Sequence, residues 1–208
     1  MFQIDKCGRL WAIDSGMVDL FKSPRRRQCQ PQLVAFSLAT DKLSQRYKFP
    51  DNVLSEGSIL TTVAIDVRDT NNRCSDTFAY VADVTGFSII VYDVRNNKSW
   101  RVQSNTMYPW PPYGVFKTNN VEFDLMDGII GLAVGPMKNG DRDLYYHAFA
   151  SVKESWVPTS VLKNESIYSS GFNTAPREFK MSEGERSSQT APQAFDKKGK
   201  LKMQEERL

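Results

Sequence analysis

The side chains best suited to chemistry in this sequence are a single histidine and three cysteines. Nucleophilic catalysis of the Ser/His/Asp or Cys/His type needs a histidine as base. His147 lies within the aromatic and apolar run Tyr145–Ala148, which predicts an ordinary strand residue rather than a catalytic one. A structural zinc site needs about four nitrogen or sulfur ligands, and no Cys-x-x-Cys pair is present. The sequence therefore predicts no metal, no cofactor and no catalytic residue.

Two aspartates stand at matching places in the chain, each at the end of a strand-like run. Asp14 and Asp83 are both followed by a turn that contains a glycine, Gly16 or Gly86. General acid–base catalysis would need the two carboxylates in one pocket. Repetition of the same arrangement instead favours a structural role, in which each carboxylate accepts hydrogen bonds from N–H groups of its turn.

Short apolar runs rich in β-branched and aromatic residues dominate the chain, and turn residues separate them. The segment from Asp76 to Val102 holds three such runs, divided by the turns Asp-Val-Thr-Gly and Arg-Asn-Asn-Lys. Each run is too short for a typical helix, so this segment predicts three antiparallel strands. The full set of expected strands is Phe2–Asp5, Arg9–Asp14, Gln32–Leu38, Ser44–Phe49, Ile59–Val67, Phe78–Ala82, Ser88–Val94, Lys98–Val102, Asp127–Val134, Asp143–Ala150, Trp156–Leu162 and Gln189–Phe195.

The expected strands recur in groups. Leu10–Asp14 matches Ala79–Asp83, and Leu144–His147 occupies the same place in a third group, a spacing of about 65–70 residues. This pattern predicts an all-β fold, a β-propeller, of which the chain supplies about three blades and part of a fourth in a single partial domain. Unclosed blades leave apolar sheet faces exposed. The predicted blades span about 1–50, 59–106 and 127–165, with the start of another at 185–208.

The charged residues are balanced and scattered along the chain. The 208 residues include 27 basic and 24 acidic side chains, a net charge of +3, which argues against nucleic acid as a partner. The one dense basic run, Arg25–Arg27, predicts a solvated loop tip, with a polyanion contact as the alternative. No apolar run approaches the roughly 20 residues of a membrane-spanning helix, so no membrane is expected as a partner. No signal-peptide pattern follows Met1.

In a propeller, the first strand of each blade lines the central channel, and the mouths of the channel are the usual ligand sites. Asp127, just before Gly128, is suited either to pair with a ligand ammonium or to serve as a plain turn aspartate. All four tryptophans are interpreted as packing between blades rather than as ligand platforms. The candidate ligand-binding residues on the first strands are Gln3, Thr61, Thr62, Asp127, Ser188 and Gln189.

Five segments stand out in order: CGRLWAIDSG from Cys7, LVAFSL after Cys29-Gln30-Pro31, FAYVADVTGFSIIVYD, SWRV and DGIIGLAVGP. Together they resemble the yellow / major royal jelly protein family of insects, from Phe2 to about Leu162. The resemblance implies a secreted propeller with six blades in the family, of which this chain covers about the middle half. The tail from Lys200 departs from it, because the family continues there with an apolar strand.

The resemblance also implies chemistry outside the cell. Secretion makes Cys7, Cys29 and Cys74 disulfide candidates. Three cysteines cannot all pair within the chain, so one is expected to bond a cysteine elsewhere, and the sequence does not say which. The sequons at Asn97 and Asn164 are glycosylation candidates.

The function that the resemblance implies is binding of a small aromatic amine or catechol, in cuticle pigmentation by the melanin pathway. Two alternatives stay open at this point. One is a dopachrome-converting isomerase, and the other is a structural or nutritive protein without a small-molecule site. The oligomeric state is left open by the sequence.

Overall fold

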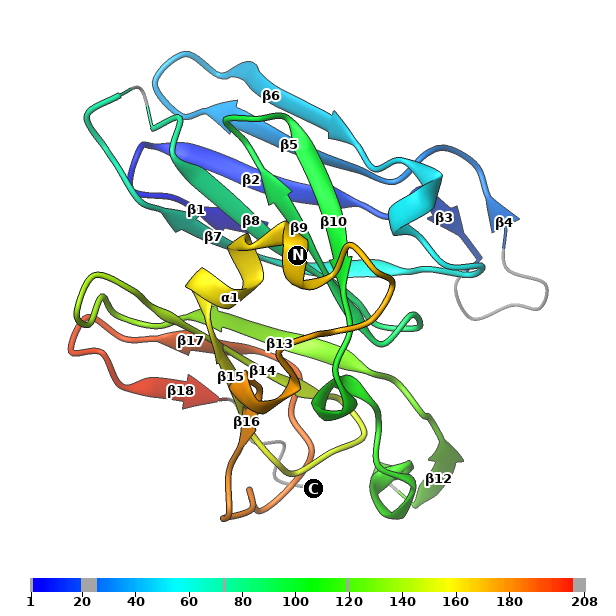
Figure 1. The fold of residues 1–208 in the computed structure, drawn as a ribbon. Helices are drawn as coiled ribbons and strands as arrows, with labels where there is room; N and C mark the ends of the chain where they lie inside the picture. The colour runs from blue at the N-terminus through cyan, green and yellow to red at the C-terminus, as the bar shows by residue number, and fades with distance from the viewer. Residues whose placement is uncertain (1, 20–25, 73, 119, 204–208) are drawn as a thin grey trace.

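The computed structural model describes residues 2–19, 26–72, 74–118 and 120–203. Its main elements are three four-stranded antiparallel sheets that follow one another along the chain (Figure 1). They confirm the all-β class. The first sheet has the order β1 (Phe2–Ile4), β2 (Arg9–Asp14), β5 (Gln32–Ser37), β6 (Lys42–Lys48); the second has β7 (Leu60–Val67), β8 (Thr77–Asp83), β9 (Ser88–Asp93), β10 (Lys98–Val102); the third has β13 (Ile129–Val134), β14 (Asp143–Ala148), β15 (Ser155–Pro158), β16 (Lys180–Met181).

Smaller elements complete the described part of the chain. Three two-stranded pairs are formed by β3 (Met17–Val18) with β4 (Arg26–Arg27), β11 (Val115–Thr118) with β12 (Val121–Asp124), and β17 (Gln193–Phe195) with β18 (Leu201–Met203). The helical segments are α1 (Thr159–Lys163) and the 3-10 turns η1 (Asp51–Val53), η2 (Asn105–Met107), η3 (Pro111–Tyr113), η4 (Glu165–Ile167) and η5 (Pro176–Glu178). Among the described residues, no helix has the length and apolar character needed to cross a membrane.

The first strands of successive sheets are neighbours in space. β1 contacts β7, β7 contacts β13, and β13 contacts β17. Each sheet therefore turns its first strand toward the same inner region, while β6 and β10 form outer edges of their sheets. This arrangement positions the candidate site. The number of blades and their closure into a ring stay predictions.

Two apolar cores join the three sheets. The core between the first and second sheets contains Trp11, which is fully buried. The core between the second and third sheets contains Trp100, and burying a large side chain of this kind stabilises a fold by about 1.5–3 kcal/mol. The expected packing role is confirmed for these two tryptophans. Trp110 and Trp156 are only partly buried, and Trp156 stacks on Tyr145.

One face of the first sheet is apolar and open. Residues paired directly across strands share a face, and the pairs Ile4↔Leu10, Leu10↔Phe36 and Phe36↔Leu43 continue across all four strands. Phe2, on the same face, is 71% exposed, and Ile4 is 56% exposed. An exposed apolar sheet face was expected from an unclosed set of blades.

The third sheet differs from the sequence prediction at its outer strands. The expected strand Trp156–Leu162 ends at Pro158, and the helix α1 (Thr159–Lys163) follows directly. The carboxylate of Asp141 accepts hydrogen bonds from the Thr159 hydroxyl (2.7 Å) and the Ser160 N–H (3.1 Å), so it caps the start of the helix. The fourth strand comes from Lys180–Met181 instead, after a long connection.

The tail from Lys200 was expected to depart from the apolar strand of the family. Leu201–Met203 forms the short strand β18, which pairs with β17 and has an exposed lysine at its centre. Arg26 and Arg27 were expected at a solvated loop tip; both are exposed, but they form β4, which pairs with Met17–Val18. Their guanidinium groups lie 3.8 Å from Asp19 and 3.9 Å from Asp51. Arg25 lies outside the described residues.

Candidate functional site

A hollow of about 270 Å³ lies where the inner strands meet, and we call it the inner hollow. Strands β1, β7, β13 and β17 each contribute part of its wall, so it draws on all three sheets and on the hairpin that follows. Most of its lining residues are apolar, and polar atoms still supply much of the exposed wall. The lining residues are Phe2, Gln3, Thr62, Val63, Ala64, Leu132, Ala133, Val134, Gln193, Ala194 and Phe195.

The Gln3 amide supplies a hydrogen-bonding group to the inner hollow. Its side-chain oxygen accepts from the Ile65 N–H (2.8 Å), which leaves its NH₂ group as the arm for a ligand. The Gln193 NH₂ group donates to the Tyr145 carbonyl (2.9 Å). The Gln193 oxygen has almost no accessible surface and receives no hydrogen bond from any described residue. It therefore offers no contact to a ligand, and Gln193 is a fixed part of the wall.

The structure brings together only some of the candidate ligand-binding residues. Gln3 and Thr62 line the inner hollow, whereas Thr61 and Asp127 are not among its lining residues. Asp127 lies before β13, where its carbonyl accepts from the Ala150 N–H (3.2 Å). Gln193, which also lines the inner hollow, was not among the candidates although it lies on the expected strand Gln189–Phe195.

The two remaining candidates lie on the segment that leads to β17. The Ser188 hydroxyl donates to the Gln189 carbonyl (3.2 Å). The Gln189 side chain donates to the Tyr113 carbonyl (3.1 Å) and to the Val115 carbonyl (3.4 Å). These bonds attach the segment to η3 and β11, outside the lining of the inner hollow. Ligand contact by these residues stays a prediction.

A second hollow of about 230 Å³ adjoins the first, and we call it the charged hollow. It shares Gln3 and Val134 with the inner hollow, so the two adjoin. Its remaining lining residues are Ile4, Asp5, Lys6, Ile65, Val67 and Arg142.

The arginine of the charged hollow belongs to a buried ion-pair network. The Arg142 Nε lies 3.1 Å from the carboxylate of Asp66, and Arg68 Nη1 lies 3.4 Å from the same group. Burial raises the pKa of the Asp66 carboxyl, and the two arginines oppose this rise. Arg68 also lies 3.6 Å from Asp141 on the third sheet. The network therefore joins the second and third sheets beside the charged hollow.

The aspartates at the ends of equivalent strands have structural roles, as predicted. Asp14 accepts from the Gly16 N–H (2.9 Å), and Asp83 accepts from the Gly86 N–H (3.0 Å). Asp83 also pairs with Arg101 (2.9 Å). The two residues belong to different sheets, so they do not form a paired acid–base site.

His147 is a buried strand residue of β14, as predicted. Its Nδ1 lies 2.9 Å from the Glu154 carboxylate and its Nε2 lies 2.8 Å from the Thr190 carbonyl. Arg186 donates to the same carboxylate (3.0 Å). Both ring nitrogens are therefore engaged with protein groups, and the imidazole holds the segment before β17 against the third sheet.

The backbone beside His147 leaves no room for a larger residue. A Cβ atom at Gly131 would lie 2.3 Å from Cε1 of the His147 ring. We expect Gly131→Ala to lower the free energy of unfolding by about 1–3 kcal/mol, because the ring must move out of its buried position. Urea unfolding measures this change. Gly184→Ala is the matched control, since nothing lies within 4 Å of a Cβ there; equal midpoints for both variants would contradict the prediction.

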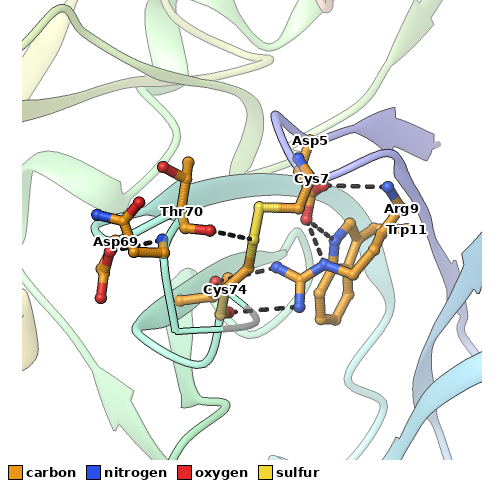
Figure 2. Close-up of a disulfide and its surroundings, with 9 residues drawn as sticks. Asp5, Cys7, Arg9, Trp11, Asp69, Thr70 and Cys74 are labelled. Carbon is orange, nitrogen blue, oxygen red and sulfur yellow. Dashed lines mark hydrogen bonds and ion pairs between the residues drawn. A yellow bond between two sulfur atoms is a disulfide. The ribbon is translucent and has the colours of Figure 1, made fainter.

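The cysteines are divided between one disulfide and one thiol. Cys7 and Cys74 form a disulfide that ties the first turn of sheet one to the loop before β8, as Figure 2 shows. Cys29 is an exposed free cysteine. The pairing that the sequence left open is thus Cys7 with Cys74. A bond from Cys29 to a cysteine elsewhere stays a prediction.

A third and larger hollow, of about 560 Å³, lies away from the inner strands. It is lined by Trp100, Arg101, Tyr168 and Phe172, together with polar residues of β10 and the segment after α1. Both sequons flank it, because Ser99 and Glu165 belong to its lining. Asn97 and Asn164 are exposed, and glycosylation there stays a prediction.

Repeated four-stranded antiparallel sheets with a hollow on their inner strands define the chain as an all-β repeat protein. The model of the major royal jelly protein family matches residues 1–207, and the chain belongs to this family. The resemblance noted in the sequence is therefore confirmed.

Three relatives illustrate the similarity. The chain is 34% identical to a dopaminechrome tautomerase of Drosophila melanogaster, over 79% of this chain and 35% of that protein. It is 32% identical to protein yellow of Drosophila subobscura, over 79% of this chain and 29% of that protein. It is 32% identical to the yellow-related salivary protein SP04 of Phlebotomus argentipes, over 78% of this chain and 42% of that protein. The chain therefore spans less than half the length of these relatives.

Proposed function

We propose that this protein acts in pigmentation by binding a small aromatic amine or catechol in the inner hollow. The observation that carries the proposal is the inner hollow, where aromatic and aliphatic side chains lie beside the Gln3 amide. Relatives named protein yellow and dopaminechrome tautomerase support a role in pigment chemistry. The Cys7–Cys74 disulfide supports an extracellular location, since disulfides persist in oxidising compartments.

The geometry suggests how such a ligand binds. Phe2, which is 71% exposed, and the partly buried Phe195 supply apolar surface for an aromatic ring. The Gln3 NH₂ group donates to a ring oxygen of the ligand.

A tautomerase is the second candidate function, and the name of the first relative given above favours it. A tautomerisation moves a proton, so it needs an acid or base within hydrogen-bonding reach of the substrate. Among the described residues, the lining of the inner hollow has no titratable side chain. We therefore assign the part of the wall that this chain supplies to binding and orientation. A structural or nutritive role without a ligand is the remaining alternative.

Thermal unfolding with and without methylcatechol or dopamine tests the proposal. A ligand at 100 times its dissociation constant stabilises the native state by about 2.7 kcal/mol, so the midpoint should rise. We expect Gln3→Leu to weaken binding by about two- to tenfold, because one neutral hydrogen bond to the ligand is lost. Gln28→Leu, at an exposed position outside the hollow, is the matched control. Cooperative unfolding that no ligand shifts would favour the structural or nutritive alternative.

A further inference from the structure

The inner hollow and the charged hollow adjoin each other and differ in charge. Gln3 and Val134 line both of them. The inner hollow has no charged side chain among its described lining residues, whereas the charged hollow has Lys6, Arg142 and Asp5. A ligand ring in the inner hollow therefore lies next to these charges.

The acid of the charged hollow is already neutralised by the protein. The Asp5 side chain is 1% exposed, and the Arg9 Nε lies 2.7 Å from its carboxylate. The Trp11 indole N–H donates to the same oxygen (2.7 Å), and the N–H groups of Cys7 and Arg9 donate to the other. With these donors in place, Asp5 offers no free carboxylate to a ligand ammonium.

The cations in and beside the charged hollow outnumber the acids that pair with them. Arg142 shares the Asp66 carboxylate with Arg68, so two guanidinium groups face one acid. Arg68 reaches a second acid, Asp141, which Lys163 also approaches (3.9 Å). Lys6 is exposed at the rim and makes no ion pair with any described residue. A partly enclosed, low-dielectric wall concentrates the resulting positive potential.

We infer that the charged hollow is an anion subsite, and that the preferred ligand is an aromatic ring carrying a carboxylate. The ring occupies the inner hollow, and the carboxylate faces Lys6 and Arg142. The inference rests on the proposed function and specifies its ligand class. It also disfavours pairing with a ligand ammonium, one of the two roles suggested for Asp127, because an ammonium at this end meets Lys6 and Asp127 is outside both linings.

Three catechols that share one ring and differ in charge test the inference. Dihydroxyphenylacetate carries a negative group, methylcatechol is neutral, and dopamine carries an ammonium. Calorimetric titration of the full chain at neutral pH and low salt should give the tightest binding for the acetate, by about tenfold over methylcatechol, which corresponds to ~1.4 kcal/mol. This advantage should shrink as salt is added, because Lys6 lies at the solvent-accessible rim. Dopamine should bind most weakly.

Reversing the charge of Lys6 tests whether this residue causes the preference for a carboxylate. Lys6→Glu should remove the advantage of dihydroxyphenylacetate, improve dopamine binding and leave methylcatechol unchanged, whereas Lys6→Arg should keep the original order. Lys48→Glu is the matched control, since Lys48 is an exposed lysine on β6 outside both hollows. Lys6 is a better position for this substitution than Arg142. Arg142 pairs with buried Asp66, so replacing Arg142 would also lower the stability of the fold.

The outcomes separate the inference from the proposed function. If methylcatechol binds but the acetate gains nothing, or dopamine binds most tightly, the anion subsite is wrong and the ring site stands. The same holds if Lys6→Glu leaves the order of affinities unchanged. If none of the three catechols binds to a chain that unfolds cooperatively, the proposed function and the inference both fail.

Discussion

Replacing Asp5 with alanine is expected to lower the free energy of unfolding by about 3–5 kcal/mol, the cost of breaking a buried charge pair. One Asp5 oxygen accepts from Arg9 Nε and from the Trp11 indole (2.7 Å each). The other accepts from the N–H groups of Cys7 (2.8 Å) and Arg9 (3.1 Å). Alanine leaves these donors without an acceptor, including an indole in the core. Urea unfolding of the variant measures the loss.

The effect of Asp5 should depend on pH in a defined direction. Burial alone would raise the pKa of Asp5, but hydrogen bonds from Trp11 and Arg9 outweigh it and hold the pKa below its ordinary value of 3.8. The charged form is therefore favoured by folding. Its contribution is complete above about pH 4 and is lost as the pH falls through the lowered folded-state pKa. The stability gap between wild type and Asp5→Ala should narrow over that acid range.

An exposed aspartate provides the control for both measurements. Asp124 lies on β12 with its side chain in solvent, and Asp124→Ala should change stability by less than about 0.5 kcal/mol. Asp5→Ala is compared with Asp124→Ala in two ways. A loss of unfolding free energy no larger than that of Asp124→Ala would show that the Asp5 carboxylate is not held as the structure places it. A loss that stays constant as the pH falls below about 4 would show the same.

The second sheet shows how much of the fold the sequence determines. Its strands were predicted to within about one residue at each boundary, because β8 and β9 are buried on both faces and read as continuous apolar runs. The turns between them carry Asp83–Gly86 and Asp93–Asn96, whose carboxylates accept from the turn N–H groups. Local pattern and turn chemistry therefore agree throughout this sheet.

Elements defined by long-range contacts were not predictable in the same way. β16 has only the two exposed residues Lys180–Met181, so no alternation of polar and apolar residues marks it. The exposed hairpin of β11 and β12 was missed for a related reason, since β12 is exposed throughout. The candidate site has the same limitation. Gln3, Thr62 and Gln193 come from separate strands, and only the contacts of β1, β7, β13 and β17 bring them together.

Removing the Cys7–Cys74 disulfide is expected to lower the free energy of unfolding by about 4 kcal/mol. The bond links residues separated by 67 positions, and in the chain-entropy model a loop of this length restricts the unfolded chain by about that amount. The double variant Cys7→Ser, Cys74→Ser should therefore unfold at much lower urea concentration. Adding a reductant should bring the wild type toward the double variant and leave the variant unchanged.

Cys29→Ser is the matched control, because it makes the same chemical change at a cysteine outside the disulfide. The bond and the Asp5 cluster belong to one junction between the first two sheets (Figure 2): Arg9 reaches the Cys74 carbonyl (3.4 Å) and the Thr77 hydroxyl (3.0 Å). Residues that share partners are coupled, so the loss from combining both changes should differ from the sum of the separate losses. Losses of unfolding free energy that add exactly would contradict a junction built as one unit. So would a Cys29→Ser variant as unstable as the double cysteine variant. Because Gln3 and Lys6 flank Asp5 in the chain, this junction also fixes one wall of the proposed binding site.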